Sequence, residues 1–342
     1  MLSTKNTAFR RCRNILPFLM ALTLPACWPH GYNYNYGELP ETPVNLQEFN
    51  SEYDDYNSTA PSLGNLIPFC FSTNRKSNGG DFDVIYEPMN VNFDKTTGVL
   101  KVTNAYDNWG IFAEDYGKVL QAVKKINGEG NEFGPYLLYD REGDVYDFEL
   151  VLLYASDVDG DFDIGFTYNT DSTGFSESTP VEFLNSEAND HYPCFTKDFS
   201  EIYFCSDREN GVFDIFHTES HVEEGMVIKV LEETETHDIR KDSILSGVSD
   251  DKCPYIFENT LVFTSNREGG FGGFDLYYSK FIDGQWSVPV NFGEEINTEY
   301  NEYRPILFDE GVDNDRNMMV FSSDRPGGLG GFDLYFVGVL KQ

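Results

Sequence analysis

Residues Leu261-Val-Phe-Thr-Ser-Asn-Arg267 and Gly269-Gly-Phe-Gly-Gly-Phe-Asp-Leu-Tyr277 decide the fold. An apolar strand leads into Ser-Asn-Arg, a glycine-rich turn follows, and Phe-Asp opens a second apolar strand. The same order returns in Met319-Val-Phe-Ser-Ser-Asp-Arg325 and Gly327-Gly-Leu-Gly-Gly-Phe-Asp-Leu-Tyr335. Self-similarity of this kind indicates a repeat architecture, in which each copy is one supersecondary unit.

Three weaker copies, at 70–86, 151–165 and 202–216, bring the number of repeats to five, and the copy at 151–165 has lost its arginine. The arginines of the other four copies are Arg75, Arg208, Arg267 and Arg325. The aspartates of the five Phe-Asp pairs are Asp83, Asp163, Asp214, Asp275 and Asp333. Because each repeat supplies both charges, we expect Arg/Asp pairs that hold the turn, rather than a ring of arginines that binds anions.

Each core is preceded by an Asn or Asp four residues before a proline, as in Asn301 and Pro305 or Asn57 and Pro61. Further strand signals, such as residues 286–292, complete a unit of four short strands. Such a unit spans roughly 50 to 60 residues, the size of one propeller blade. The 30 Gly and 15 Pro, with Tyr and Phe far more frequent than Trp, also favour strands and turns.

The two ends of the chain predict how the ring closes. Residues 43–46 resemble an outer strand that has no blade before it, and the last unit lacks a fourth strand. We therefore expect an all-β fold, a β-propeller over 43–342 with five four-stranded blades, closed by the N-terminal strand joining the C-terminal blade. An insertion near 88–130 contains an amphipathic stretch that favours a short helix, with a degenerate sixth blade as the alternative.

These motifs resemble the TolB-type, WD-repeat-like β-propeller family, whose repeat carries a strand with proline, a Ser-Asn/Asp-Arg turn, a glycine run and an Asp-Leu-Tyr strand. The resemblance covers residues 43–342. It implies a cell-envelope protein of the kind common in Bacteroidota, whose propeller binds protein partners. The sequence contains no appended peptidase or peptidoglycan-binding domain, so those activities are not carried over.

The N-terminus resembles a bacterial signal peptide. Residues 1–26 contain four basic residues, no acid and an apolar run of about ten residues, which is too short to cross a bilayer. The run ends in Leu24-Pro-Ala-Cys27, which resembles a lipobox. We therefore expect Cys27 to carry a lipid that is the sole membrane anchor, and 27–42 to form a tether. We expect an outer-membrane lipoprotein that faces the periplasm or the cell surface. An ordinary secreted protein is the alternative.

The charge of the chain excludes one class of partner. Lys and Arg total 24 against 58 Asp and Glu, so the formal net charge is −34, which repels a nucleic-acid backbone. With 40% hydrophobic and 15% aromatic residues, the chain differs from a disordered acidic tail and can bury a core.

Two small sites follow from spacing. Cys194 and Cys205 flank a predicted hairpin that would place them opposite each other, so an exported protein could form a disulfide there; two buried free thiols are the alternative. Alternating carboxylates around a glycine resemble the start of a calcium loop, although they lack its distal glutamate; a solvated acidic turn is the alternative. These carboxylates are Asp157, Asp159, Asp161 and Asp163.

The sequence contains no Gly-x-Ser-x-Gly elbow and no metalloprotease motif, and no other cofactor is indicated. Our first hypothesis is therefore a non-catalytic lipoprotein whose acidic propeller binds an envelope protein or peptide. The alternative is a glycan-binding or glycan-cleaving propeller, because aromatic and carboxylate residues suit a central sugar pocket. Two carboxylates in that pocket would favour the alternative, whereas closure of the channel by Arg/Asp pairs would remove its site.

Overall fold

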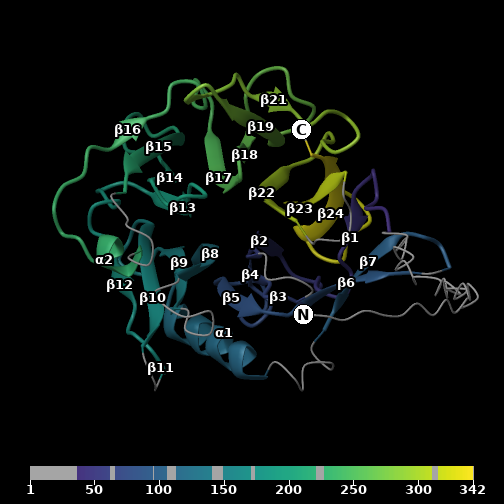
Figure 1. Ribbon diagram of the computed structural model, residues 1–342, viewed down its shortest axis with the longest axis horizontal. Coiled ribbons are helices and arrows are strands. Elements are labelled where there is room, and N and C mark those ends of the chain that lie inside the picture. The colour runs from purple at the N-terminus through teal and green to yellow at the C-terminus, as the bar shows by residue number, and fades with distance from the viewer. Residues whose placement is uncertain are drawn as a thin grey trace, which may run out of the picture. The chain divides into compact units, whose positions relative to one another are not determined.

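The computed structural model describes residues 37–61, 66–94, 96–105, 113–140, 149–170, 174–220, 227–309 and 315–341. Within the unit that begins at Tyr36, five blades follow one another around a ring, and the innermost strand of each blade packs against the next (Figure 1). The innermost strands are β2 (Asp55–Thr59), β8 (Glu132–Asp140), β13 (Asp190–Phe195), β17 (Asp251–Phe257) and β22 (Glu302–Phe308). The predicted all-β, five-bladed propeller is confirmed.

Antiparallel strands build each blade outward from its innermost strand. Blade 1 continues with β4 (Cys70–Thr73) and β5 (Asp83–Tyr86), and blade 3 with β14 (Glu201–Ser206), β15 (Asp214–Glu219) and β16 (Arg240–Lys241). In blades 2 and 4 two short outer strands pair with the third strand. Blade 2 adds β9 (Glu149–Ser156), β10 (Asp163–Thr170), β11 (Gly174–Phe175) and β12 (Thr179–Pro180). Blade 4 adds β18 (Thr260–Ser265), β19 (Asp275–Ile282), β20 (Gln285–Trp286) and β21 (Val290–Asn291).

Blade 5 contains both ends of the ring. After β22 come β23 (Arg316–Ser323) and β24 (Asp333–Leu340), and the outermost strand is β1 (Val44–Asn45). Val44 pairs with Phe336, and Asn45 pairs with Tyr335. The predicted closure of the ring by the N-terminal strand is therefore confirmed.

Blade 1 departs from the four-stranded plan. Its sheet has three described strands, and the nearby insertion forms a second three-stranded sheet of β3 (Leu66–Ile67), β6 (Met89–Phe93) and β7 (Leu100–Asn104). The predicted helix is α1 (Ala113–Ile126), which contacts β5, β9 and β10, and it buries Val119, Ala122, Val123 and Ile126. The insertion adds no sixth blade to the described part of the ring. The only other helix described is the short α2 (Val227–Leu231), and none of the described helices is long and apolar enough to span a membrane.

Neighbouring blades are joined by a repeated set of hydrogen bonds, which we call the interblade bracket. An Asn or Asp side chain just before each innermost strand accepts a hydrogen bond from the amide of the Phe-Asp phenylalanine in the preceding blade. The carbonyl of that phenylalanine accepts a bond from the next residue of the strand. The five side-chain bonds are Phe82 to Asn131, Phe162 to Asn189, Phe213 to Asp250, Phe274 to Asn301 and Phe332 to Asp54.

The bracket residue is fixed in turn by a second Asn or Asp, which follows the second strand of the same blade. Asn189 donates two hydrogen bonds to the Asp207 carboxylate, one from its backbone N–H and one from Nδ2, both with a length of 2.9 Å. Where the first residue is Asp, as in Asp54 and Asp250, the second is Asn74 or Asn266. The assignment of Asn57, four residues before Pro61, to this repeat position is therefore wrong. Asp54 holds the position in blade 1.

The glycine-rich turns allow the blades to approach closely. A Cβ atom on Gly330 of blade 5 would lie 1.8 Å from the carbonyl oxygen of Tyr53, and one on Gly272 of blade 4 would lie 1.9 Å from that of Tyr300. Both carbonyl oxygens belong to the next blade. A side chain at either glycine would therefore force neighbouring blades apart.

Exchange of the two bracket residues tests the Asn/Asp complementarity. In Asn189→Asp two carboxylates would face each other, so we expect a loss of about 1–3 kcal/mol in the free energy of unfolding. Adding Asp207→Asn recreates the arrangement of blades 1 and 4 and should restore most of that loss, as a double-mutant cycle measured by urea unfolding would show. Additive effects of the two substitutions would contradict this account.

Candidate functional site

The innermost strands share one irregularity close to their first residues. Each has a β-bulge two residues after its first residue, and the residue there has a positive φ of 48° to 59°. These residues are Asn57, Gly134, Tyr192, Cys253 and Arg304. Four of the five are not glycine, and the left-handed backbone conformation is energetically unfavourable for such residues. The surrounding fold must therefore impose this conformation.

This layer fills the centre of the ring. Tyr192 and Arg304 are large, and Gly134 provides room, because a Cβ there would lie 2.4 Å from the Tyr192 ring. Arg304 is fully buried. Its guanidinium donates to the carbonyls of Pro254 and Pro135 at 3.1 and 3.4 Å and lies over the Tyr192 ring.

A cavity of about 430 Å³ lies against this layer. Residues from all five blades line it: Asp54, Tyr56, Phe82, Phe133, His191, Tyr192, Lys252, Phe274, Asn301, Tyr303 and Phe332. Its walls come from the second residue of each innermost strand and from three of the five phenylalanines of the interblade bracket, Phe82, Phe274 and Phe332. A concave, mostly aromatic pocket with a few polar groups is the usual form of a small-molecule site.

Two polar side chains in the cavity have few partners. His191 is 8% exposed and its Nε2 has no hydrogen-bond partner, while its ring stacks on Phe213 and meets Phe162 edge to face. Burial and the nearby positive charge of Lys252 lower the pKa of His191 to about 3, so its ring is neutral at physiological pH. The Lys252 ammonium lies 3.9 Å from the centre of the Phe213 ring and, among the described residues, forms no ion pair.

Asp54 is the one carboxylate among the residues that line the cavity. Its Oδ1 accepts the Phe332 amide at 2.7 Å, and its Oδ2 accepts the Asn74 amide at 3.4 Å. The pair of carboxylates expected for a glycan-cleaving pocket is therefore not found in this lining. The channel is not closed by Arg/Asp pairs either, because those pairs lie inside the blades.

The Phe-Asp repeat marks three of the wall residues, but the sequence did not single out the others. Tyr56, Phe133, His191, Lys252 and Tyr303 occupy one position of the repeat, directly after the acid that begins each innermost strand. Their position was therefore available from the repeat, but their varied residue types concealed it.

The predicted partners of the repeat arginines need correction. Arg75, Arg208, Arg267 and Arg325 pair with the first acid of the innermost strand in their own blade. These acids are Asp55, Asp190, Asp251 and Glu302, at 2.5 to 2.9 Å. Each guanidinium also donates to a backbone carbonyl and packs over aromatic rings of strands two and three or, for Arg75, over Phe71.

The Phe-Asp aspartates have other roles. Asp275 and Asp333 accept backbone amides of the glycine-rich turns that precede them. Asp83 pairs with Lys76, and Asp214 with Lys241. In Asp163, burial and neighbouring carboxylates raise the pKa to about 6. These aspartates order the turns and outer strands instead of neutralising the arginines.

The proposed calcium ligands do not converge. Both oxygens of Asp157 accept bonds from Asn131, Asp163 is the Phe-Asp aspartate of blade 2, and Asp159 and Asp161 belong to the turn between β9 and β10. No group of three or more His, Cys, Asp or Glu side chains able to hold a metal occurs in the described part of the chain.

The predicted disulfide between Cys194 and Cys205 is wrong. Phe195 lies opposite Ile202, which centres the hairpin on Asp198 and Phe199, one residue earlier than a Cys194–Cys205 pair requires. Cys194 therefore lies opposite Tyr203, and Cys205 lies opposite His191 beyond the bulge. Both are buried free thiols that pack in different apolar clusters. Cys27 and the proposed signal peptide lie outside the described residues.

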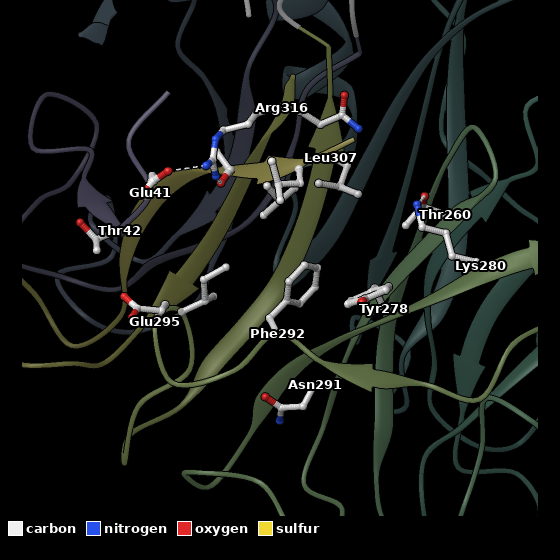
Figure 2. Close-up of a pocket in the computed structure, with 15 residues that line it drawn as sticks. Glu41, Thr42, Thr260, Tyr278, Lys280, Asn291, Phe292, Glu295, Leu307 and Arg316 are labelled. Carbon is white, nitrogen blue, oxygen red and sulfur yellow. Dashed lines mark hydrogen bonds and ion pairs between the residues drawn. The ribbon is translucent and has the colours of Figure 1, made fainter. Parts of the chain in front are cut away.

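A larger cavity of about 520 Å³ lies between the outer parts of blades 4 and 5 (Figure 2). Arg316 pairs with Glu41 there, at 2.5 Å, and Lys280 donates to the Thr260 hydroxyl. The first contact fixes the segment around Glu41 to β23 of blade 5, and the second joins β19 to β18 within blade 4. The central cavity, with its unpartnered polar groups, is therefore the stronger candidate for a functional site.

Comparison with solved structures gives the same fold. A thermostable family-43 glycoside hydrolase has a TM-score of 0.51 at 11% identity, over 87% of this chain and 94% of that one. A GH62 hydrolase in complex with xylotriose gives 0.49 at 10%, over 88% and 95%. The catalytic domain of the Coprinopsis cinerea GH62 α-L-arabinofuranosidase gives 0.47 at 11%, over 89% and 97%. No family model matches the sequence, and no curated protein is similar to it.

These neighbours correct three expectations. The TolB-type assignment is wrong, because the family-43 neighbour is a glycoside hydrolase and only the general propeller fold is shared with the TolB-type family. The expectation of a non-catalytic scaffold for a protein or peptide partner is contradicted, and so is the expectation that the chain is not an enzyme.

Blade 2 supplies a test of the Arg/acid pairs. Its first acid, Glu132, is 1% exposed, Val158 takes the place of the arginine, and Oε2 of Glu132 has no hydrogen-bond partner. Burial, reinforced by the charges of Asp83 and Asp157, raises the pKa of Glu132 to about 8. The folded chain therefore holds a proton there that the unfolded chain releases near pH 4.5.

The free energy of unfolding should fall as pH rises from about 4.5 to 8, because over that range the unfolded state binds fewer protons at Glu132. Glu132→Gln should remove this part of the pH dependence, and Val158→Arg should stabilise the protein by about 1–3 kcal/mol at pH 8 by supplying the missing partner. Urea unfolding of both variants at several pH values measures this. If the difference in the free energy of unfolding between the wild type and Glu132→Gln does not vary with pH, the raised pKa of Glu132 would be contradicted.

Proposed function

We propose that this chain is a carbohydrate-active propeller whose central cavity binds a saccharide. The observation that carries the proposal is the cavity itself, where aromatic walls from all five blades surround a buried His191 nitrogen without a partner. Aromatic faces suit the apolar faces of sugar rings, and isolated polar groups suit their hydroxyls. A thermostable family-43 glycoside hydrolase shares this fold over 87% of the chain, which supports a glycan as the ligand.

The chemistry of cleavage sets the second part of the proposal. Glycoside hydrolysis usually needs two carboxylates, one as acid and one as base or nucleophile. Asp54 is the one carboxylate in the lining and is already engaged in the interblade bracket. We therefore rest the proposal on saccharide binding. Bond cleavage is tested separately, by chromatography of oligosaccharides that have been incubated with the wild-type protein or with Asp54→Asn.

Substitution of His191 separates binding from stability. His191→Phe keeps an aromatic ring between Phe162 and Phe213 and removes the unpartnered nitrogen, so we expect it to stabilise the fold by about 1 kcal/mol. It should also weaken saccharide binding about five- to tenfold, because one hydrogen bond to the ligand is lost. Calorimetric titration with xylo- and cello-oligosaccharides and thermal unfolding measure the two effects.

His217→Phe is the matched control, since His217 lies on β15, outside the cavity lining, and contacts Glu201 at 3.0 Å. It should lower stability and leave binding unchanged. Binding that His191→Phe leaves intact, or saccharide binding that is absent altogether, would overturn the proposed site.

A further inference from the structure

The central cavity contains a cation that forms no ion pair with a described carboxylate. At the wall position that holds Tyr56, Phe133, His191 and Tyr303 in four blades, blade 4 has Lys252. Its ammonium lies between the rings of Phe213 and Phe274, 3.9 and 5.8 Å from their centres. Asp251, the acid next to it in sequence, is already paired with Arg267 at 2.5 Å. No carboxylate therefore neutralises Lys252 among the described residues.

A second cation lies in the layer beneath. Arg304 is fully buried, contacts the Tyr192 ring that lines the cavity, and bonds to carbonyl groups instead of a carboxylate. Asp54 is the single anionic group in the lining, and two hydrogen bonds already stabilise its charge. The cavity and its floor thus carry two cations against one engaged carboxylate, in a chain whose net charge is −34.

We infer that the cavity selects a saccharide that carries a carboxylate, that is, a uronic acid residue; the inference rests on the proposed function. A carboxylate placed at Lys252 gains a charge-assisted hydrogen bond, and the aromatic walls strengthen it by excluding water. The unpartnered nitrogen of His191 adds a neutral contact to a hydroxyl. The rest of the acidic protein repels anions at long range, so recognition depends on these short-range contacts.

Paired ligands that differ only in charge test the inference. Trisaccharides of galacturonate, glucuronate and mannuronate, each with its methyl ester, are titrated into the full-length protein by calorimetry at low and high salt. We expect at least one acid to bind ten or more times more tightly than its ester, with the ratio shrinking as salt rises. Lys252→Gln should reduce that ratio to about one.

Lys280→Gln is the charge-matched control, because Lys280 lines the outer cavity, and it should keep the wild-type ratio. If Lys252 only supports Phe213, Lys252→Gln would weaken acid and ester equally, and the inference would be wrong. Equal wild-type binding of acids and esters would also overturn it while leaving the proposed function intact. A protein that binds neither these ligands nor neutral oligosaccharides would refute both.

Discussion

The interblade bracket is the interaction on which the rest of the structure depends. It combines one side-chain acceptor, one backbone acceptor and a supporting Asn or Asp, and it occurs five times at the same place in the repeat. It fixes the first residue of every innermost strand against the preceding blade. Because neighbouring side chains of a strand point to opposite sides, it also decides which residue faces the blade interior and which faces the channel.

Both chemical features of the molecule follow from that alternation. The acid after the bracket residue points into the blade and meets an arginine, except at Glu132. The next residue points to the centre and forms the cavity wall. The arginine pairs are therefore structural, and the side chains that differ from blade to blade are those that line the central cavity. Variation at the wall position, including Lys252 and His191, then adjusts the cavity without disturbing the ring.

The fold could be predicted because the repeat states it five times, and because the unpaired strand signals at 43–46 and at the last unit complement each other. The site could not be predicted as a whole, since the Phe-Asp motif marks only three of its phenylalanines and the other wall residues share a position and not a type. Two errors came from pairings that the sequence does not mark. The hairpin between β13 and β14 turns one residue earlier than expected, which separates Cys194 from Cys205. The arginines pair with acids on the innermost strand and not with the aspartates of the Phe-Asp turn. The family assignment failed because a propeller repeat specifies a fold, and the same fold carries unrelated functions.

Closure by β1 has a consequence for the order of folding. The bond between Phe332 and Asp54 joins positions 278 apart, and that between Leu334 and Asn50 joins positions 284 apart. A growing chain can complete blades 2, 3 and 4 from local pairings, but the last bracket must await almost the whole sequence. Contacts of such separation slow folding, and until they form β24 presents an open edge that can pair with another chain. The two residues of β1 thus act late, and the time before they dock is when this protein is most exposed to aggregation.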